Sequence, residues 1–250
     1  MKKLIATAPL LLGATITASL LPATTATTAT AATAAAAENK KPNIVFILID
    51  DMGYECVGAC GGAAYRTPNI DALARDGVRF THAWAQPLCT PSRVELMTGK
   101  YNYKNYVDFG FMNQDQKTFG NLAQMAGYTT AIAGKWQLGA NSKLPAHFGF
   151  DTYCLWQLNY KNNRKAVRYE RYADPLLEED GKILPDPRDP DAYGPDLFEN
   201  YVEKFIDANK DKDKPFFLQG LRRFASNLLE ISENIFLLDK CACFVLSRLG

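Results

Sequence analysis

A thiol at Cys89 is followed four residues later by the guanidinium of Arg93. Residues four apart on a helix share one face, so a helix here brings both side chains to one side. Thr90 is the predicted N-cap, Pro91 fits the first helical position, and Gly99 fits the residue after the helix. Cys89 is then at a helix N-terminus, where unpaired N–H groups favour anions. Together with Arg93, this arrangement predicts a site for a tetrahedral oxyanion.

The run 89–99 reads C-T-P-S-R-x-x-x-x-T-G and closely resembles the signature of the formylglycine-dependent sulfatases. The resemblance implies that a formylglycine-generating enzyme oxidises Cys89 to formylglycine, whose hydrated aldehyde attacks the sulfur of a sulfate ester. It also implies that Pro91 and Arg93 belong to the recognition element for that enzyme, and that Arg93 stabilises the modified side chain. A buried cysteine before an ordinary capped helix is the alternative interpretation.

Two adjacent carboxylates, Asp50 and Asp51, come directly after the apolar residues 44–49. Carboxylates at the end of a buried strand repel each other and resist desolvation unless a cation joins them. Oxygen ligands favour a hard cation, which predicts calcium or magnesium rather than zinc; calcium is the ion that the family resemblance described next implies. The pattern also resembles the N-terminal metal motif of the sulfatases, which implies that Asp50, Asp51 and the modified Cys89 bind the ion. A helix cap or a solvated turn is the alternative for the two aspartates.

A third group of polar residues follows the strand predicted over 128–133. The sequence of residues 134–139, G-K-W-Q-L-G, resembles the sulfatase element G-K-W-H-L-G. This resemblance implies that Lys135 is a catalytic residue that contacts the sulfate and the modified cysteine. Gln137 stands where the family commonly has a histidine. Because a glutamine cannot shuttle protons near neutral pH, we expect Gln137 to bind substrate by hydrogen bonding instead.

Strand-like and helix-like stretches alternate along the chain, which predicts an α/β fold with a mostly parallel sheet and helices on both faces. The resemblance implies the alkaline phosphatase/sulfatase-like form of this fold. Sites in open α/β sheets lie at the carboxyl ends of the strands, where Asp50 and Lys135 stand. Residues 153–195 lack a clear period and predict an irregular excursion over that end. The other expected strands cover 78–84 and 214–218, and the expected helices follow Thr67, follow Thr118 and span 197–206.

Residues 1–37 are predicted to lie outside the fold. Lys2 and Lys3 precede an apolar stretch, and an Ala/Thr-rich spacer follows, which is the pattern of a secretory signal peptide. This pattern predicts a secreted or periplasmic protein, with a membrane anchor as the alternative. For an exported enzyme, the resemblance to the sulfatases implies that the substrates are sulfated polysaccharides. The charges nearly balance, with 28 Lys+Arg against 27 Asp+Glu, so we expect no nucleic-acid partner and no stable membrane association.

The resemblance to the sulfatases covers residues 41–218, which we expect to form the N-terminal part of the catalytic domain. From about Gln219 the family pattern is lost, and residues 219–250 contain neither an Asp-Asn pair nor a histidine. We therefore expect an aberrant tail there, a fold incomplete at its C-terminus, and an activity that the missing half puts in doubt. A lineage-specific tail is the alternative. Two other functions stay open: a phosphate or phosphonate ester hydrolase of the same superfamily, and a non-catalytic fragment.

Overall fold

The computed structural model describes residues 41–50, 52–156, 158, 172–173, 175–184, 189–222 and 242–245, with 221–222 and 242–245 as backbone only. The predicted signal peptide and spacer, the predicted metal ligand Asp51, and most of the predicted tail lie outside these residues.

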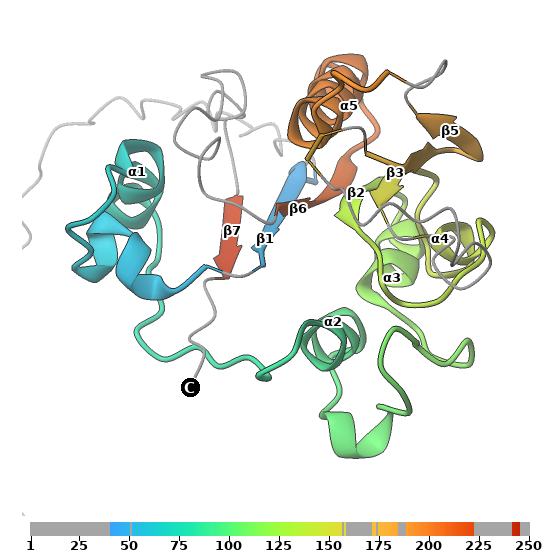
Figure 1. Cartoon of the computed structure of the whole chain (residues 1–250), viewed down its shortest axis with the longest axis horizontal. Coiled ribbons are helices and arrows are strands. Elements are labelled where there is room, and N and C mark those ends of the chain that lie inside the picture. Colours follow the sequence, from blue (N-terminus) through green and yellow to red (C-terminus); the bar gives the residue numbers. More distant parts are fainter. Residues whose placement is uncertain are drawn as a thin grey trace, which may run out of the picture. The chain divides into compact units, whose positions relative to one another are not determined.

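The centre of the fold is one sheet in which seven strands of the described residues take the order β5-β4-β3-β2-β6-β1-β7 (Figure 1). The pairings from β3 through β2, β6 and β1 to β7 are parallel, whereas β4 pairs antiparallel with both β3 and β5. The predicted mostly parallel α/β sheet is therefore confirmed. The strands are β1 (Ile44–Ile49), β2 (Thr129–Lys135), β3 (Thr152–Trp156), β4 (Leu177–Glu179), β5 (Lys182–Leu184), β6 (Phe216–Arg222) and β7 (Ala242–Val245).

The helices come from segments whose ends carry proline, threonine or glycine at suitable positions. None of the helices in the described residues has both the length and the apolar character needed to span a bilayer. The helices are α1 (Pro68–Asp76), α2 (Cys89–Thr98), α3 (Phe119–Met125), α4 (Leu144–His147) and α5 (Gly194–Asn209), with single 3-10 turns at Tyr54–Cys56, Gly58–Cys60 and Asn102–Lys104.

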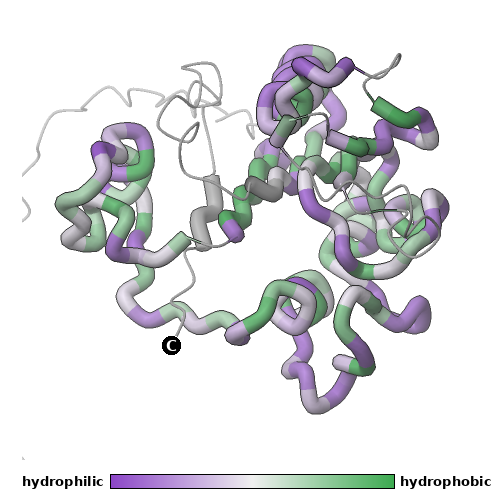
Figure 2. The backbone as a smooth tube through the Cα atoms, in the orientation of Figure 1, coloured by the Kyte–Doolittle hydropathy of each residue, from purple (hydrophilic) through white to green (hydrophobic). Residues whose placement is uncertain are grey.

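Apolar side chains cover the sheet on both faces. On β2 and β6, Ile132 and Phe217 belong to the cluster that α2 and α3 cover, whereas Ala131 and Leu218 belong to the cluster that α5 covers. Successive strand residues point to opposite faces, so a continuous apolar run such as β1 suits a sheet buried on both sides. Figure 2 shows β1 as a predominantly hydrophobic segment, and Figure 1 shows α5 and α2 on opposite sides of the sheet.

Helix α2 begins two residues earlier than a Thr90 cap would allow, so that prediction is wrong. Leu88 is the N-cap, with extended backbone at φ −117° and ψ 154°, and Cys89 is the first helical residue. The buried hydroxyl of Thr90 instead accepts a hydrogen bond from the N–H of Gly110 at 3.1 Å. The other end agrees with the sequence, because Gly99 adopts the left-handed conformation (φ 64°) and its N–H donates to the carbonyl of Glu95.

Two further sequence predictions are corrected by the structure. No strand forms over 78–84, where Val78, Phe80 and Trp84 are exposed. Within this segment only Trp84 is a bridge residue, so the alternating pattern is not matched by a continuous ladder of hydrogen bonds. The stretch 153–195, predicted to be irregular, contains most of β3, all of β4 and β5, and the first turn of α5.

Helix α3 starts at a capping box, as the threonine at its N-terminus predicts. The hydroxyl of Thr118 accepts from the N–H of Asn121 and donates to the carbonyl of Phe148 at 2.6 Å. The Asn121 side chain in return accepts from the N–H of Thr118 at 3.0 Å. Because Thr118 is buried, its hydroxyl ties α3 to the turn that precedes β3.

The substitution Thr118→Ala should lower the free energy of unfolding by about 1–2 kcal/mol, since it removes the cap and leaves the Phe148 carbonyl without its donor. Thr118→Ser keeps the hydroxyl and should retain most of this stability. Urea denaturation followed by circular dichroism measures both variants. Equal stability of the alanine and serine variants would show that the capping box contributes nothing.

Candidate active site

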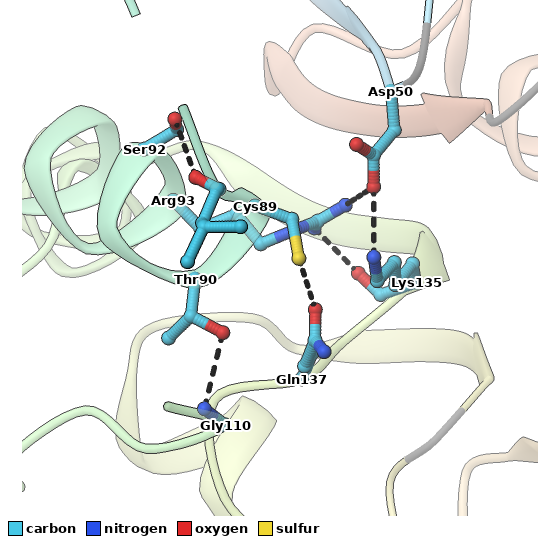
Figure 3. Close-up of polar contacts among 9 residues, drawn as sticks. Asp50, Cys89, Thr90, Ser92, Arg93, Gly110, Lys135 and Gln137 are labelled. Carbon is cyan, nitrogen blue, oxygen red and sulfur yellow. Dashed lines mark hydrogen bonds and ion pairs between the residues drawn. The ribbon is translucent and has the colours of Figure 1, made fainter. Parts of the chain in front are cut away.

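Three segments that are far apart in the sequence bring polar side chains to one edge of the sheet (Figure 3). Asp50 directly follows β1, Lys135 is the last residue of β2, and Gln137 lies two residues beyond it. Helix α2 supplies Cys89 and Arg93 from its first two turns. Because β1 and β2 both run parallel to β6, which lies between them, their carboxyl ends meet at the same edge.

One carboxylate lies between two cations at the centre of this site. Oδ2 of Asp50 is 2.9 Å from Nζ of Lys135 and 3.2 Å from Nη2 of Arg93. The side chains of Arg93, Lys135 and Asp50 are only 4%, 8% and 15% exposed, so water screens these ion pairs little. Burial acts to raise the pKa of Asp50, but the charges and hydrogen bonds of Arg93 and Lys135 outweigh it and hold the pKa below its usual value.

Arg93 also connects the helix to the sheet through the main chain. Its Nη1 donates to the carbonyl oxygen of Lys135 at 2.7 Å, while Nη2 contacts Asp50. Two such bonds fix the plane of a guanidinium, whose donors form a rigid fork. Arg93 therefore links α2 to the ends of both β1 and β2.

The thiol of Cys89 contacts Gln137, which lies two residues after the end of β2. Sγ donates to Oε1 of Gln137 at 2.8 Å. Gln137 has φ 52°, in the left-handed region that residues other than glycine rarely occupy. Such a conformation costs on the order of 1 kcal/mol, and strain of this kind is concentrated at functional sites. The preceding Trp136 is fully buried, which anchors the strand end from which Gln137 projects.

Contacts that the sequence did not reveal hold the start of α2 in place. Oγ of Ser92 lies 2.8 Å from the carbonyl of Leu88 and 3.0 Å from that of Gln86, so it ties the first turn to the preceding loop. The N–H of Gly110 donates to the hydroxyl of Thr90, next to the thiol in the chain. A separation of 20 residues between Thr90 and Gly110 follows no local period, so no pattern signals this contact.

The chemistry of Asp50 suits a hard cation, but the described residues supply only part of a ligand set. Both ion pairs of Asp50 use Oδ2, and within the described ranges Oδ1 accepts no hydrogen bond. The same ranges contain no group of three or more His, Cys, Asp or Glu side chains able to hold a metal ion. Asp51, the second predicted carboxylate, lies outside them.

Comparison with known proteins agrees with this geometry. A family model described as Sulfatase matches residues 42–220, which is more than half of the chain. The chain belongs to the sulfatase family. An N-acetylglucosamine-6-O-sulfatase of Bacteroides thetaiotaomicron is 35% identical over 182 residues, which cover 72% of this chain and 30% of that protein. The chain thus spans about a third of the length of this relative.

Solved structures of sulfatases share the fold as well. The protein BT4656, solved in complex with its substrate D-glucosamine-2-N,6-O-disulfate, is 32% identical and has a TM-score of 0.61. The match covers 75% of this chain and 35% of that one. Ps i-CgsB in complex with k-i-k-neocarrahexaose is 29% identical, with a TM-score of 0.63 and coverage of 80% and 49%. The fold is therefore alkaline phosphatase/sulfatase-like, as the sequence predicts.

The substitution Asp50→Asn should lower the free energy of unfolding at pH 7 by about 1–3 kcal/mol, because it removes the buried carboxylate that Lys135 and Arg93 share. The folded-state pKa of Asp50 is depressed, so its contribution is present above the unfolded value of about 3.9 and is lost as the pH falls through the folded value. The difference between wild type and variant should therefore be constant from about pH 6 to 8 and shrink below about pH 4.

Denaturation in the presence of EDTA at several pH values measures this difference. Asp207→Asn is the matched control, because Asp207 forms an exposed ion pair with Lys210 at 2.9 Å. That variant should leave the free energy of unfolding unchanged. A difference for Asp50→Asn that persists undiminished at pH 3 would contradict the assigned charge interaction.

Proposed function

We propose that this chain acts in sulfate ester hydrolysis, with Cys89 converted to formylglycine as the nucleophile. The observation that carries the proposal is the Cys89 thiol at the start of α2, beside two cations and a carboxamide that converge from β2 and the same helix. Family membership supports the reaction type. A formylglycine-generating enzyme is then a required partner, because the thiol itself is not the reactive group.

Once converted, residue 89 supplies a hydrated aldehyde, one hydroxyl of which attacks the sulfate sulfur while the S–O bond to the substrate alcohol breaks and the alcohol leaves. Loss of the proton from the second hydroxyl then re-forms the aldehyde and releases sulfate. Arg93 and Lys135 provide positive charge beside this point and stabilise the charge that develops on the sulfate oxygens. The Gln137 carboxamide holds the reactive side chain and hydrogen-bonds the substrate, since it both donates and accepts. The N-terminal N–H groups of α2 favour the anion further.

A divalent cation completes this proposal. Asp50, Asp51 and the modified Cys89 are the proposed ligands, with calcium as the ion and magnesium as the alternative. When bound, the ion supplies additional positive charge to the sulfate group. Oδ1 of Asp50 is oriented away from the two ion pairs, which use Oδ2, so metal binding need not break them.

The proposed substrate class is a sulfated saccharide. The relative named N-acetylglucosamine-6-O-sulfatase and the structure with D-glucosamine-2-N,6-O-disulfate support this class. Residues 1–37 are proposed to be a signal peptide with its spacer, which places the protein in the periplasm or outside the cell, where such saccharides occur. The sulfatase domain is proposed to occupy residues 41–218; strand β6 continues past this boundary to Arg222.

Co-expression with a formylglycine-generating enzyme should convert the Cys89 thiol to an aldehyde. The tryptic peptide that contains Cys89 should show the mass of the aldehyde and should react with a hydrazide probe. Cys89→Ala should abolish both signals. Cys154→Ala is the matched control and should leave both signals unchanged, because the Cys154 thiol is fully buried. An unmodified thiol in protein purified from its own host would remove the proposed mechanism.

The variant Lys135→Ala should lower kcat/KM for a chromogenic aryl sulfate by about 10²–10³, with added calcium, because one stabilising charge is lost. Lys210→Ala is the control, since Lys210 is a surface lysine that pairs only with Asp207 among the described residues. Turnover of an aryl phosphate is assayed in parallel. Faster turnover of the phosphate than of the sulfate would favour a phosphate ester hydrolase.

A further inference from the structure

The segment after α2 exposes a group of large apolar side chains. We call residues 100–110 the aromatic loop; it includes the 3-10 turn Asn102–Lys104 (Figure 1, the green segment that follows α2). Exposing such side chains is unfavourable unless they contact something, and clustered apolar exposure marks binding sites. The exposed residues are Tyr101 (69%), Tyr103 (81%), Val107 (64%) and Phe109 (46%).

The aromatic loop is held against α2 at both ends of that helix. Nδ2 of Asn105, a buried residue, donates to the hydroxyl of Thr98 at 2.8 Å, at the last residue of the helix. The N–H of Gly110 donates to the hydroxyl of Thr90, one residue from Cys89 (Figure 3). The loop therefore leaves the C-terminus of α2 and returns to its N-terminus. Phe109, next to Gly110 in the chain, is brought close to the proposed nucleophile.

In the part of the aromatic loop that directly follows the C-terminus of α2, two aromatic rings lie beside a cation. The rings of Tyr101 and Tyr103 stack with centroids 6.0 Å apart and an interplanar angle of 15°. Nζ of Lys104 lies 5.6 Å from the centroid of the Tyr103 ring. A flat aromatic face suits the apolar C–H face of a pyranose ring, and an ammonium group suits a sulfate substituent. Such a pair of groups recognises a sugar and its charge together.

We propose that the aromatic loop is a subsite for a sulfated saccharide residue that is distant from the sulfate ester at Cys89. This inference rests on the proposed function, which it deepens by making the substrate an oligosaccharide. Helix α2 has ten residues, so its two ends are separated by about 15 Å. A monosaccharide bound at the N-terminus of α2 cannot span the length of the helix, whereas a chain of several sugar residues can.

A glycan is favoured over a protein partner by charge and by geometry. Lys100 and Lys104 add positive charge to the loop, and Nζ of Lys100 is held by Oε1 of Gln116 at 2.9 Å. The loop contains one acidic residue, Asp108, whose carboxylate accepts from the N–H of Phe109. The net positive charge of the loop complements a polyanionic saccharide.

The test measures binding of the full chain to a heparin-derived hexasaccharide, to its desulfated form and to a sulfated monosaccharide by isothermal titration calorimetry. Tyr103→Ala and Lys104→Ala should each weaken hexasaccharide binding about tenfold and leave monosaccharide binding unchanged. The exposed residue Tyr65 gives the matched control Tyr65→Ala, which should change neither. Circular dichroism verifies that each variant folds. Binding of the hexasaccharide should weaken as the ionic strength rises.

Each result decides for or against the subsite. Equal hexasaccharide affinity of Tyr103→Ala, Lys104→Ala and wild type overturns it, as does equal affinity for the sulfated and desulfated chains. Absence of hexasaccharide binding by wild type also overturns it. The peptide mass at Cys89 tests the proposed function separately: a modified Cys89 with no loop effect removes only the subsite, whereas an unmodified thiol removes the catalytic proposal.

Discussion

The carboxylate of Asp50 is the group on which the arrangement of the site depends. It is the only anion among the described residues that contacts both Arg93 and Lys135, and these two cations are almost completely buried. Without the carboxylate, the two positive charges would repel each other at the point where α2 meets the sheet. Removing one partner of a buried ion pair costs more free energy than the intact pair contributes, because the other charge stays buried without its counter-charge. The contact therefore holds together the end of β1, the end of β2 and helix α2.

The same constraint prepares the site for an anionic substrate. Among the described residues, the ion pairs join one carboxylate to two cations, and the N-terminus of α2 adds its N–H groups. The donors are already oriented before any ligand arrives, because Arg93 is fixed to the Lys135 carbonyl and Gln137 to the Cys89 thiol. Preorganised donors of this kind need no reorganisation when charge develops on a bound group.

Much of the site was predictable because its residues follow strong local signals. The apolar run 44–49 predicts a strand covered on both faces, and a polar residue directly after such a strand is expected at the sheet edge. The start of α2 was less predictable, since Thr90 has the preferred cap chemistry but its hydroxyl is used by Gly110, which is distant in the sequence. The missing strand at 78–84 has a related cause: alternation describes one segment, whereas a strand also needs a continuous ladder to a neighbour, and in this segment only Trp84 is a bridge residue. The left-handed conformation of Gln137 could not be predicted from the sequence, because residues other than glycine rarely adopt it.

The contact between Arg93 and the sheet uses the main-chain carbonyl of residue 135. A carbonyl is present whatever side chain the residue carries, so the register between α2 and β2 is independent of the amino acid at that position. The lysine head group can consequently be exchanged while the helix keeps this anchor. A change of the head group at position 135 thus alters the charge beside Asp50, and with it the preference for one tetrahedral oxyanion over another, while the main-chain anchor of α2 stays in place.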